Sequence, residues 1–315
     1  MNPELESLFT NGLTDSLNAL NAARRKLISS FVLTICMSVL ILVLIFLFNP
    51  FLKYFSCVVF LIFSVALLSS RFRRQQKKYQ LQFKNLIISP LTQLVEGDLK
   101  YQPESGIDLE TFKLSKLVKG PIDKFHSEDL FTGAIGETSF QFSEIVAKEK
   151  QDSESCGNSH ITAFKGLFLV ANFNKTIKSK LTVFPDVFAE KWGFLGEIVS
   201  REIFPTDGME RIKLEDSSFE KCFEVFGDDQ VESRYILTPS LMRRFVELRD
   251  KKQFFGASFR ENQLFIVVYL TKDLFEPHVF RKTINMKEIE LFLDYLTFMT
   301  KIVIDLNLNN RIYKT

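Results

Sequence analysis

The fold is decided by two apolar stretches near the N-terminus, LISSFVLTICMSVLILVLIFLF at residues 27–48 and FLKYFSCVVFLIFSVALLSS at residues 51–70. The first stretch contains no charged residue, and the second contains only Lys53, close to its start. A helix needs about 20 residues to cross the ~30 Å hydrocarbon core of a bilayer, so both stretches are long enough. An Asn-Pro pair separates them, and proline does not continue a helix. We therefore predict a transmembrane hairpin of two antiparallel helices over residues 27–70.

A signal peptide and a buried helical hairpin are two alternatives that fit this sequence less well. A signal peptide has a basic start and a shorter apolar region. Here a long segment with the acidic residues Glu4, Glu6 and Asp15 comes first, and a second span follows at once. A helical hairpin buried in a soluble core rarely contains uncharged runs of this length. The membrane hairpin is therefore the leading interpretation.

Both ends of the predicted hairpin are flanked by basic residues. These flanks consist of Arg24, Arg25 and Lys26 before the first span and Arg71, Arg73, Arg74, Lys77 and Lys78 after the second. Because the positive-inside rule places such residues in the cytoplasm, we expect a multi-pass protein with both termini cytoplasmic. The same side chains can contact anionic lipid head groups, each worth about 1 kcal/mol near the surface, although setting the topology alone explains them. The lipid bilayer and its anionic head groups are therefore the first predicted partners.

The remaining composition argues against several classes of function. The chain has 40 Lys and Arg against 38 Asp and Glu, and this balance gives no basis for a nucleic-acid partner. The four cysteines, Cys36, Cys57, Cys156 and Cys222, lack the paired spacing of a disulfide framework or a zinc site. Phenylalanine is unusually frequent, at 34 of 315 residues, and we expect it to fill core positions.

The position of the hairpin divides the chain into four segments. Residues 1–26 are predicted to be a cytoplasmic amphipathic helix, since leucines recur at helical spacing through residues 5–20. Residues 71–107 are predicted to form a juxtamembrane helix and a linker interrupted by Gly and Pro. We expect the helical parts of these two segments to pair as a stalk. The remaining residues, 108–315, are expected to form a soluble domain.

The soluble segment mixes strand and helix patterns. Stretches rich in Phe, Val, Ile and Thr predict strands at residues 130–137, 139–150, 161–173, 179–185, 210–216, 219–227 and 231–237. A Thr-Pro pair at residues 238–239 begins a predicted helix, and residues 287–304 repeat apolar side chains at helical spacing. Residues 254–270 predict a β-hairpin that turns at residues 261–262. The fold class is therefore α+β: a transmembrane helical hairpin, then a soluble domain with an antiparallel or mixed β-sheet and flanking helices.

No sequence motif for catalysis or cofactor binding is present. The patterns GxxxxGK[ST], GxGxxG, GxSxG and HExxH, which mark phosphate, dinucleotide, nucleophile and zinc-protease sites, are all missing. The three histidines, His126, His160 and His278, are far apart and lack the spacing of metal ligands. We therefore predict no catalytic residue, cofactor or metal site, while a triad assembled from distant positions stays open.

The densest polar stretch of the soluble segment is GDDQVESRYILTP at residues 227–239. Its glycine and two aspartates favour a turn after a strand. On a following strand, Glu232 and Arg234 would share one face. Asp228, Asp229, Glu232 and Arg234 are therefore the candidate binding surface for a ligand or partner. The alternative is a hairpin turn followed by a half-buried strand with a charged outer face.

Several of these stretches resemble a bacterial family known as domain of unknown function 3137. The resemblance lies in AFKGLFLVANFNK (163–175), TVFPD (182–186), FEKCFEVFGDDQVESRYILTPSLMRRF (219–245), ASFRENQLFIVVY (257–269) and FEP (275–277). It covers about residues 130–285, and its central block is fairly specific. It implies a membrane-anchored protein of the bacterial inner (cytoplasmic) membrane, without an assigned reaction or cofactor. It also implies a LemA-like membrane protein as a partner.

The leading interpretation is a membrane-anchored, non-enzymatic module whose cytoplasmic domain binds a protein partner or a small ligand. The first alternative is a membrane-tethered enzyme with a dispersed site near residues 228–234, for which converging carboxylates in an open pocket would be the sign. The second alternative is a secreted effector that inserts into host membranes. A two-span hairpin without ionisable residues at membrane depth makes a poor channel or transporter by itself.

Overall fold

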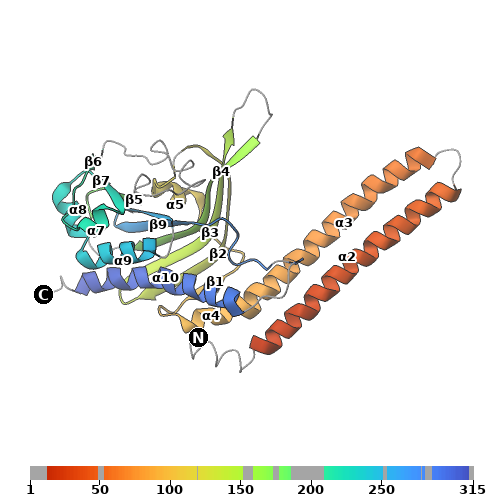
Figure 1. Ribbon diagram of the computed structural model, residues 1–315, viewed down its shortest axis with the longest axis horizontal. Helices are drawn as coiled ribbons and strands as arrows, with labels where there is room; N and C mark the ends of the chain where they lie inside the picture. The colour runs from red at the N-terminus through yellow and green to blue at the C-terminus, as the bar shows by residue number, and fades with distance from the viewer. Residues whose placement is uncertain are drawn as a thin grey trace. The chain divides into compact units, whose positions relative to one another are not determined.

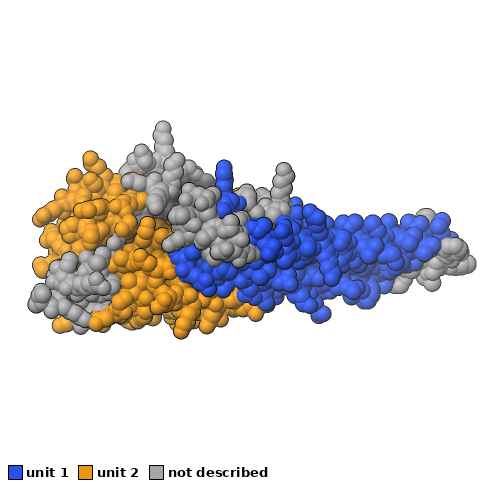
Figure 2. Space-filling model, turned by 90° about the horizontal axis from the view of Figure 1, so that it is seen from below, with its two compact units in different colours: residues 1–94, 275–291 blue, residues 95–274, 292–315 orange. Residues whose placement is uncertain are grey.

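The computed structural model describes residues 13–48, 53–118, 120–151, 159–172, 177–185, 209–250, 254–277, 279–280 and 286–311. The chain forms two compact units (Figure 2). The first unit consists of residues 1–94 and 275–291, and the second of residues 95–274 and 292–315. The chain therefore passes between the units after Leu94, after Leu274 and after Leu291.

Two long helices make up most of the first unit, α2 (Thr14–Phe48) and α3 (Lys53–Phe83) (Figure 1). They run antiparallel, side by side, as the sequence predicts for residues 27–70. Residues 13–26 are continuous with the first apolar stretch, and their leucines alternate with polar residues so that Leu13 and Leu20 are buried. Residues 1–12 of the predicted amphipathic helix lie outside the described residues.

The helix α3 ends in a series of short turns around Pro90. A π-helical turn (Lys84–Ile88) leads into α4 (Ser89–Leu91), and a 3₁₀ turn (Thr92–Leu94) follows. Proline has no N–H to donate to the carbonyl four residues earlier, here Leu86, and its ring crowds that carbonyl. The regular helix therefore gives way to the wider π turn one turn before Pro90.

One helix of the described residues is long and apolar enough to cross a membrane, and it covers residues 14–45 of α2. None of its most apolar stretch is buried within the protein. By length and composition it fits a membrane anchor or a signal sequence. The second predicted span falls in α3, where the side chains of residues 53–56 lie outside the description, so this span stays a prediction.

A nine-stranded antiparallel sheet forms the second unit, with the strand order β1-β2-β3-β4-β9-β8-β5-β7-β6. Its strands are β1 (Lys100–Gln102), β2 (Ile122–Ile135), β3 (Thr138–Gln151), β4 (Ser159–Asn172), β5 (Leu181–Pro185), β6 (Glu210–Arg211), β7 (Phe223–Gly227), β8 (Phe255–Arg260) and β9 (Gln263–Tyr269). The structure thus confirms the α+β class and shows the antiparallel form of the sheet.

Helices cover both faces of this sheet. They are α5 (Leu109–Leu114), α7 (Ser217–Glu220), α8 (Gln230–Ile236), α9 (Pro239–Asp250) and α10 (Met286–Arg311). Figure 1 shows α5 on one face, and α9 with the later part of α10 on the other. The predicted helices that begin at Pro239 and span residues 287–304 are confirmed as α9 and α10.

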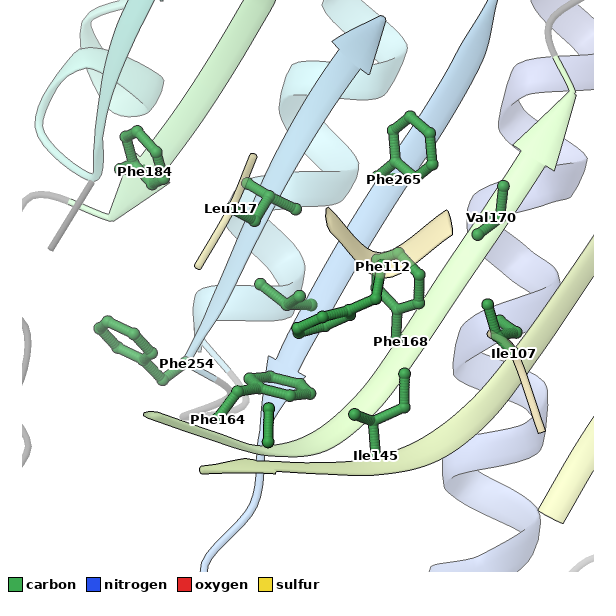
Figure 3. Packing of buried hydrophobic residues seen from close by; sticks show 12 residues of the cluster. Ile107, Phe112, Leu117, Ile145, Phe164, Phe168, Val170, Phe184, Phe254 and Phe265 are labelled. Atoms are coloured by element: carbon green, nitrogen blue, oxygen red, sulfur yellow. The ribbon is translucent and has the colours of Figure 1, made fainter. Parts of the chain in front are cut away.

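Phenylalanine fills the core, as its frequency predicts. On one face, Phe112 of α5 lies over Phe164 and Phe168 of β4, with ring centroids 5.4 and 4.9 Å away (Figure 3). On the other face, Phe245 of α9 lies 5.3 Å from Phe255 of β8. Among the residues that the structure describes, the largest fully buried side chains are phenylalanines. Such rings remove large apolar areas from water, so they hold the helices on the sheet.

The predicted β-hairpin at residues 254–270 is confirmed by β8 and β9. Glu261 and Asn262 join these strands with φ angles of 50° and 60°. Both values lie in the left-handed region that a two-residue type I′ turn requires, and asparagine tolerates it well. The turn residues therefore set the register of the hairpin.

One predicted strand is wrong, and another starts later than predicted, because aspartate caps begin helices at their N-terminal ends. The predicted strand at residues 231–237 is replaced by α8 (Gln230–Ile236), since Asp229 accepts hydrogen bonds from the N–H groups of Val231 and Glu232. The start of the predicted strand 219–227 is taken by α7, where Asp216 accepts in the same way from Ser218 and Phe219. A side-chain acceptor at the cap position satisfies the first free N–H groups of a helix.

Two other boundaries differ from prediction at the edges of the sheet. The strand predicted at 210–216 is reduced to β6, which has two residues. In contrast, the predicted linker before residue 107 contains β1, which pairs with β2 from Lys100 to Gln102. Short edge strands of this kind have weak sequence signals because only one side of the strand is paired.

Candidate functional site

The four residues of the predicted binding surface lie together at the start of α8. Asp228 follows β7, Asp229 is the N-cap of α8, and Glu232 and Arg234 belong to the helix itself. Asp228, Asp229 and Arg234 are exposed, while Glu232 is half-buried. The structure therefore brings the four residues together, but on a helix start and not on a strand.

Two of these carboxylates bind the backbone just before β5. Both carboxylate oxygens of Glu232 accept hydrogen bonds, from Lys178 N at 3.1 Å and from Ser179 N at 2.7 Å. Asp228 accepts from Lys180 N at 2.7 Å. The preceding N–H, that of Ile177, donates to the side chain of Asn262 at 2.7 Å. Side-chain oxygens thus accept from four successive backbone N–H groups, and they fix the entry to β5.

These hydrogen bonds determine the charge state of Glu232. Burial raises the pKa of this carboxyl, but the hydrogen bonds from Lys178 and Ser179 outweigh burial and hold the pKa below its usual value of 4.5. Arg234 does not pair with Glu232 in this network; its Nη2 donates to the carbonyl oxygen of Lys213 at 3.3 Å. A carboxylate that stays ionised and already accepts two N–H groups is a poor general base at neutral pH.

Sequence reasoning missed two exposed apolar residues on the same helix. Val231 is 78% exposed and Tyr235 is 46% exposed. They are four residues apart, so they lie on one face of α8. We call the exposed side chains of Val231, Arg234 and Tyr235 the α8 surface. The signal was present in the spacing of Asp229 and Glu232, an acidic cap followed three residues later by Glu, which predicts a helix start.

The α8 surface combines an apolar patch with one guanidinium group. Tyrosine and arginine are enriched in protein interfaces, where an aromatic ring and a planar cation make large contacts. The neighbouring carboxylates of Asp228 and Glu232 already accept hydrogen bonds from backbone N–H groups. The α8 surface therefore has the side-chain types of a protein contact.

A second candidate surface covers the helices α2 and α3. Their exposed apolar side chains are Val32, Leu33, Ile35, Met37, Val39, Leu40, Ile41, Val43, Leu44 and Leu47 on α2, and Val58, Val59, Leu61, Ile62, Phe63, Val65 and Leu67 on α3. We call this set the apolar shell. Exposed apolar patches on a soluble monomer rarely exceed a few hundred Å², so a shell along two whole helices marks an interaction surface.

The basic flanks lie at one end of the apolar shell. Arg25, Lys26, Arg71, Arg73, Arg74, Lys77 and Lys78 are exposed, and Arg24 is half-buried. Burial raises the pKa of the Tyr79 phenol, and the positive charge of Arg24 offsets part of this effect, so Arg24 of α2 faces Tyr79 of α3. The basic residues of the two helices therefore form one collar around the hairpin.

Several other ionisable groups form hydrogen bonds or ion pairs within the second unit. Nε2 of His160 lies 2.6 Å from a carboxylate oxygen of Asp123, and the buried carboxylate of Glu144 accepts from Leu274 N at 3.0 Å. The hydroxyl of Tyr101 donates to buried Asp129, and burial together with this carboxylate raises the pKa of the phenol. No group of three or more His, Cys, Asp or Glu that suits a metal ion occurs among the described residues, while His278 and Cys156 lie outside them.

Comparison with known proteins gives a family match. Residues 162–308 match the family model described as protein of unknown function (DUF3137). Residues 162–308 of the chain are therefore similar to this family. The resemblance found in the sequence is thereby confirmed, because the matched region contains the blocks at 163–175, 219–245 and 257–269.

The DUF3137 region runs from within β4 through most of α10 and includes the α8 surface. The helices α2 and α3 lie outside it. No curated protein matches the chain. Among solved structures, the mycobacterial trehalose monomycolate transport factor A, TtfA, aligns at 8% identity over 65% of this chain and 88% of that one, with a TM-score of 0.28.

Proposed function

We propose that this DUF3137 protein is a membrane-anchored, non-enzymatic module that presents its α+β domain at the cytoplasmic face of a bacterial inner membrane. The domain would bind a protein partner or a small ligand there. The single observation behind this proposal is the apolar shell along both α2 and α3, bounded by the basic collar at one end.

Physical arguments favour a bilayer as the cover of this shell. Each Å² of apolar surface moved out of water contributes about 25 cal/mol, so leaving two helices of this length in water is strongly unfavourable. All backbone N–H and C=O groups inside a helix are paired, which is the condition for crossing lipid. We therefore propose that both α2 and α3 span the membrane.

The charges support an orientation with both termini in the cytoplasm. Arg25 and Lys26 precede the shell on α2, while Arg71, Arg73 and Arg74 follow it on α3. Lys53 stands at the opposite end of the hairpin, at the start of α3. More positive charge near the membrane on one side marks that side as cytoplasmic.

The α8 surface supports a binding role over catalysis. The enzyme alternative required carboxylates that converge on an open pocket near residues 228–234. Instead, Asp228 and Glu232 accept hydrogen bonds from the backbone of residues 178–180. Val231 and Tyr235 remain exposed beside them. A LemA-like membrane protein, which the family resemblance implies, is the first partner to test.

Site-specific photo-crosslinking in native membranes tests the binding role. A photoreactive amino acid at Val231 of the full chain should give one discrete protein adduct, and the same group at Tyr235 should give the same adduct. The matched control is Leu114 on α5, which is 45% exposed and lies away from α8 in the chain. Adducts of equal yield and pattern at Val231 and Leu114 would contradict the assignment of the α8 surface.

A further inference from the structure

Phe280 comes from a segment far along the chain, yet it packs on the hairpin. Its ring stacks on Phe72 of α3 with centroids 5.6 Å apart and an interplanar angle of 15°. It also meets Phe31 of α2 edge-on at 6.4 Å. All three residues belong to the first unit, in which residues 275–291 join α2 and α3. The three rings form one aromatic cluster, which we call the Phe280 cluster.

The exposure of Phe280 is unusual for a packed aromatic residue. Its side chain is 67% exposed, whereas its neighbour Val279 is 5% exposed. Val279 therefore fixes this part of the segment, and Phe280 turns most of its ring outward. A large apolar side chain held in this way adds apolar surface to the outside of the hairpin. Contact with a lipid or a protein would remove this surface from water.

The level of the cluster along the hairpin is set by helix geometry. From Phe31 to the end of α2 at Phe48 there are 17 residues, or about 26 Å at 1.5 Å per residue. From Lys53 at the start of α3 to Phe72 there are 19 residues, or about 29 Å. Both lengths are close to the ~30 Å of a bilayer hydrocarbon core. The Phe280 cluster therefore lies where the hydrocarbon core ends.

The charges at this level match an anionic membrane interface. Phe72 stands between Arg71 and Arg73, and Arg74 follows; all three arginines are exposed. None of them forms an ion pair within the part of the chain that the structure describes. Aromatic rings next to cations are typical of the layer between head groups and acyl chains, where rings enter the apolar side and cations meet lipid phosphates.

We propose that Phe280 is a third membrane contact, which inserts into the interfacial layer of a bilayer containing anionic lipid. This inference rests on the proposed membrane hairpin and extends it to the segment between β9 and α10. The chain would thus return to the lipid surface about 200 residues after the second span. Residues 279–280 then anchor the DUF3137 region to the membrane independently of the linker that follows α4.

Tryptophan fluorescence in lipid vesicles tests the depth of Phe280 directly. The full chain with Trp192→Phe and Phe280→Trp has a single tryptophan. It is reconstituted in vesicles of phosphatidylcholine and phosphatidylglycerol, with bromine atoms either near the head group or near the end of the acyl chains. Leu40→Trp, in the apolar shell, and Leu114→Trp, on exposed α5, are the matched controls in the same background.

We expect a blue-shifted emission for Phe280→Trp and stronger quenching by shallow bromine than by deep bromine. Leu40→Trp should be quenched more by deep bromine, and Leu114→Trp should not be quenched. Quenching at position 40 without quenching at position 280 would overturn this inference and leave the membrane hairpin intact. A blue-shifted but unquenched emission at position 280 would show that protein, such as a second copy of the chain, covers this side chain. That result would also overturn the insertion of Phe280 into lipid.

Absence of quenching at both positions would remove the proposed anchor together with this inference. If Trp192→Phe prevents folding, the comparison is made with Trp192 retained. The Phe280→Trp chain should then show a quenchable component that the unsubstituted chain lacks. An identical quenching curve for the two chains would contradict the insertion of Phe280.

Discussion

The rings of Phe31 on α2 and Phe72 on α3 lie with their centroids 4.7 Å apart. This contact fixes the register of the two helices, because residues equally far from the turn on both sides lie at the same level. Lys26 is therefore level with Lys77, and Arg24 with Tyr79, in agreement with the electrostatic effect of Arg24 on Tyr79. The basic residues of both helices consequently meet at one end of the apolar shell.

The register places Leu40 near the middle of the proposed membrane span. Leu40 is 52% exposed on α2. Leu40→Asp should cost about 3 kcal/mol of insertion free energy, since an aspartate at the centre of a membrane helix is this unfavourable. The fraction of protein that resists alkaline extraction from membranes should fall. Leu114→Asp on α5 should leave that fraction unchanged, and equal losses for the two variants would contradict a lipid cover at Leu40.

Glu232 stabilises the second unit through the backbone before β5. Glu232→Ala removes both acceptors from the N–H groups of Lys178 and Ser179. Hydrogen bonds to a charged group are worth about 2 kcal/mol, so the free energy of unfolding should fall by about this amount. Thermal unfolding of the full chain measures the change. Glu215→Ala, at an exposed glutamate that precedes β7 in the sequence, should have almost no effect.

The same carboxylate predicts a pH dependence of stability. Hydrogen bonds hold the pKa of Glu232 below 4.5 in the folded protein, against burial, and those from Thr111 lower the pKa of Asp108 below 3.8. Their stabilising effect is complete above these usual values and is lost as the pH falls through the lowered pKa values. Glu232→Gln should be less stable at neutral pH and lose less stability below pH 4.5. Parallel pH profiles for the two proteins would contradict this role.

Phe112 joins α5 to the sheet. Its ring lies 4.9 Å from Phe168 and 5.4 Å from Phe164, and it is 1% exposed. Phe112→Ala should lower the free energy of unfolding by about 3–5 kcal/mol, because it leaves a cavity in a packed core. Leu114→Ala, at an exposed position of the same helix, should stay within about 0.5 kcal/mol. Chemical denaturation of both variants distinguishes core packing from a general sensitivity of α5.

Much of the fold follows from the sequence because its signals are local. The apolar stretches predict the course of α2 and of the first part of α3, and the turn at Glu261 and Asn262 predicts the hairpin of β8 and β9. The α8 surface was placed on a strand, because Val231, Ser233 and Tyr235 alternate with charged residues as strand residues do. The cap at Asp229 overrides this alternation by satisfying the first N–H groups of a helix.

The remaining features depend on contacts between distant residues. Glu232 meets Lys178, which is 54 positions earlier in the chain, and no local pattern predicts this pair. Phe280 meets Phe31 and Phe72 across an even longer separation. A single sequence shows neither contact, because a ring or a carboxylate has the same local appearance whether it packs, caps or faces lipid. The structure is therefore required to find the Phe280 cluster and the hydrogen bonds of Glu232 to the backbone before β5.

The central claim is that α2 and α3 both cross the membrane, and one measurement separates two spans from one. A paired topology reporter is fused to the C-terminus of the full chain, with a fluorescent protein that is active only in the cytoplasm and alkaline phosphatase that is active only outside it. Two spans with the basic collar inside predict fluorescence without phosphatase activity. Phosphatase activity without fluorescence would show that the chain crosses the membrane once, and it would contradict the hairpin.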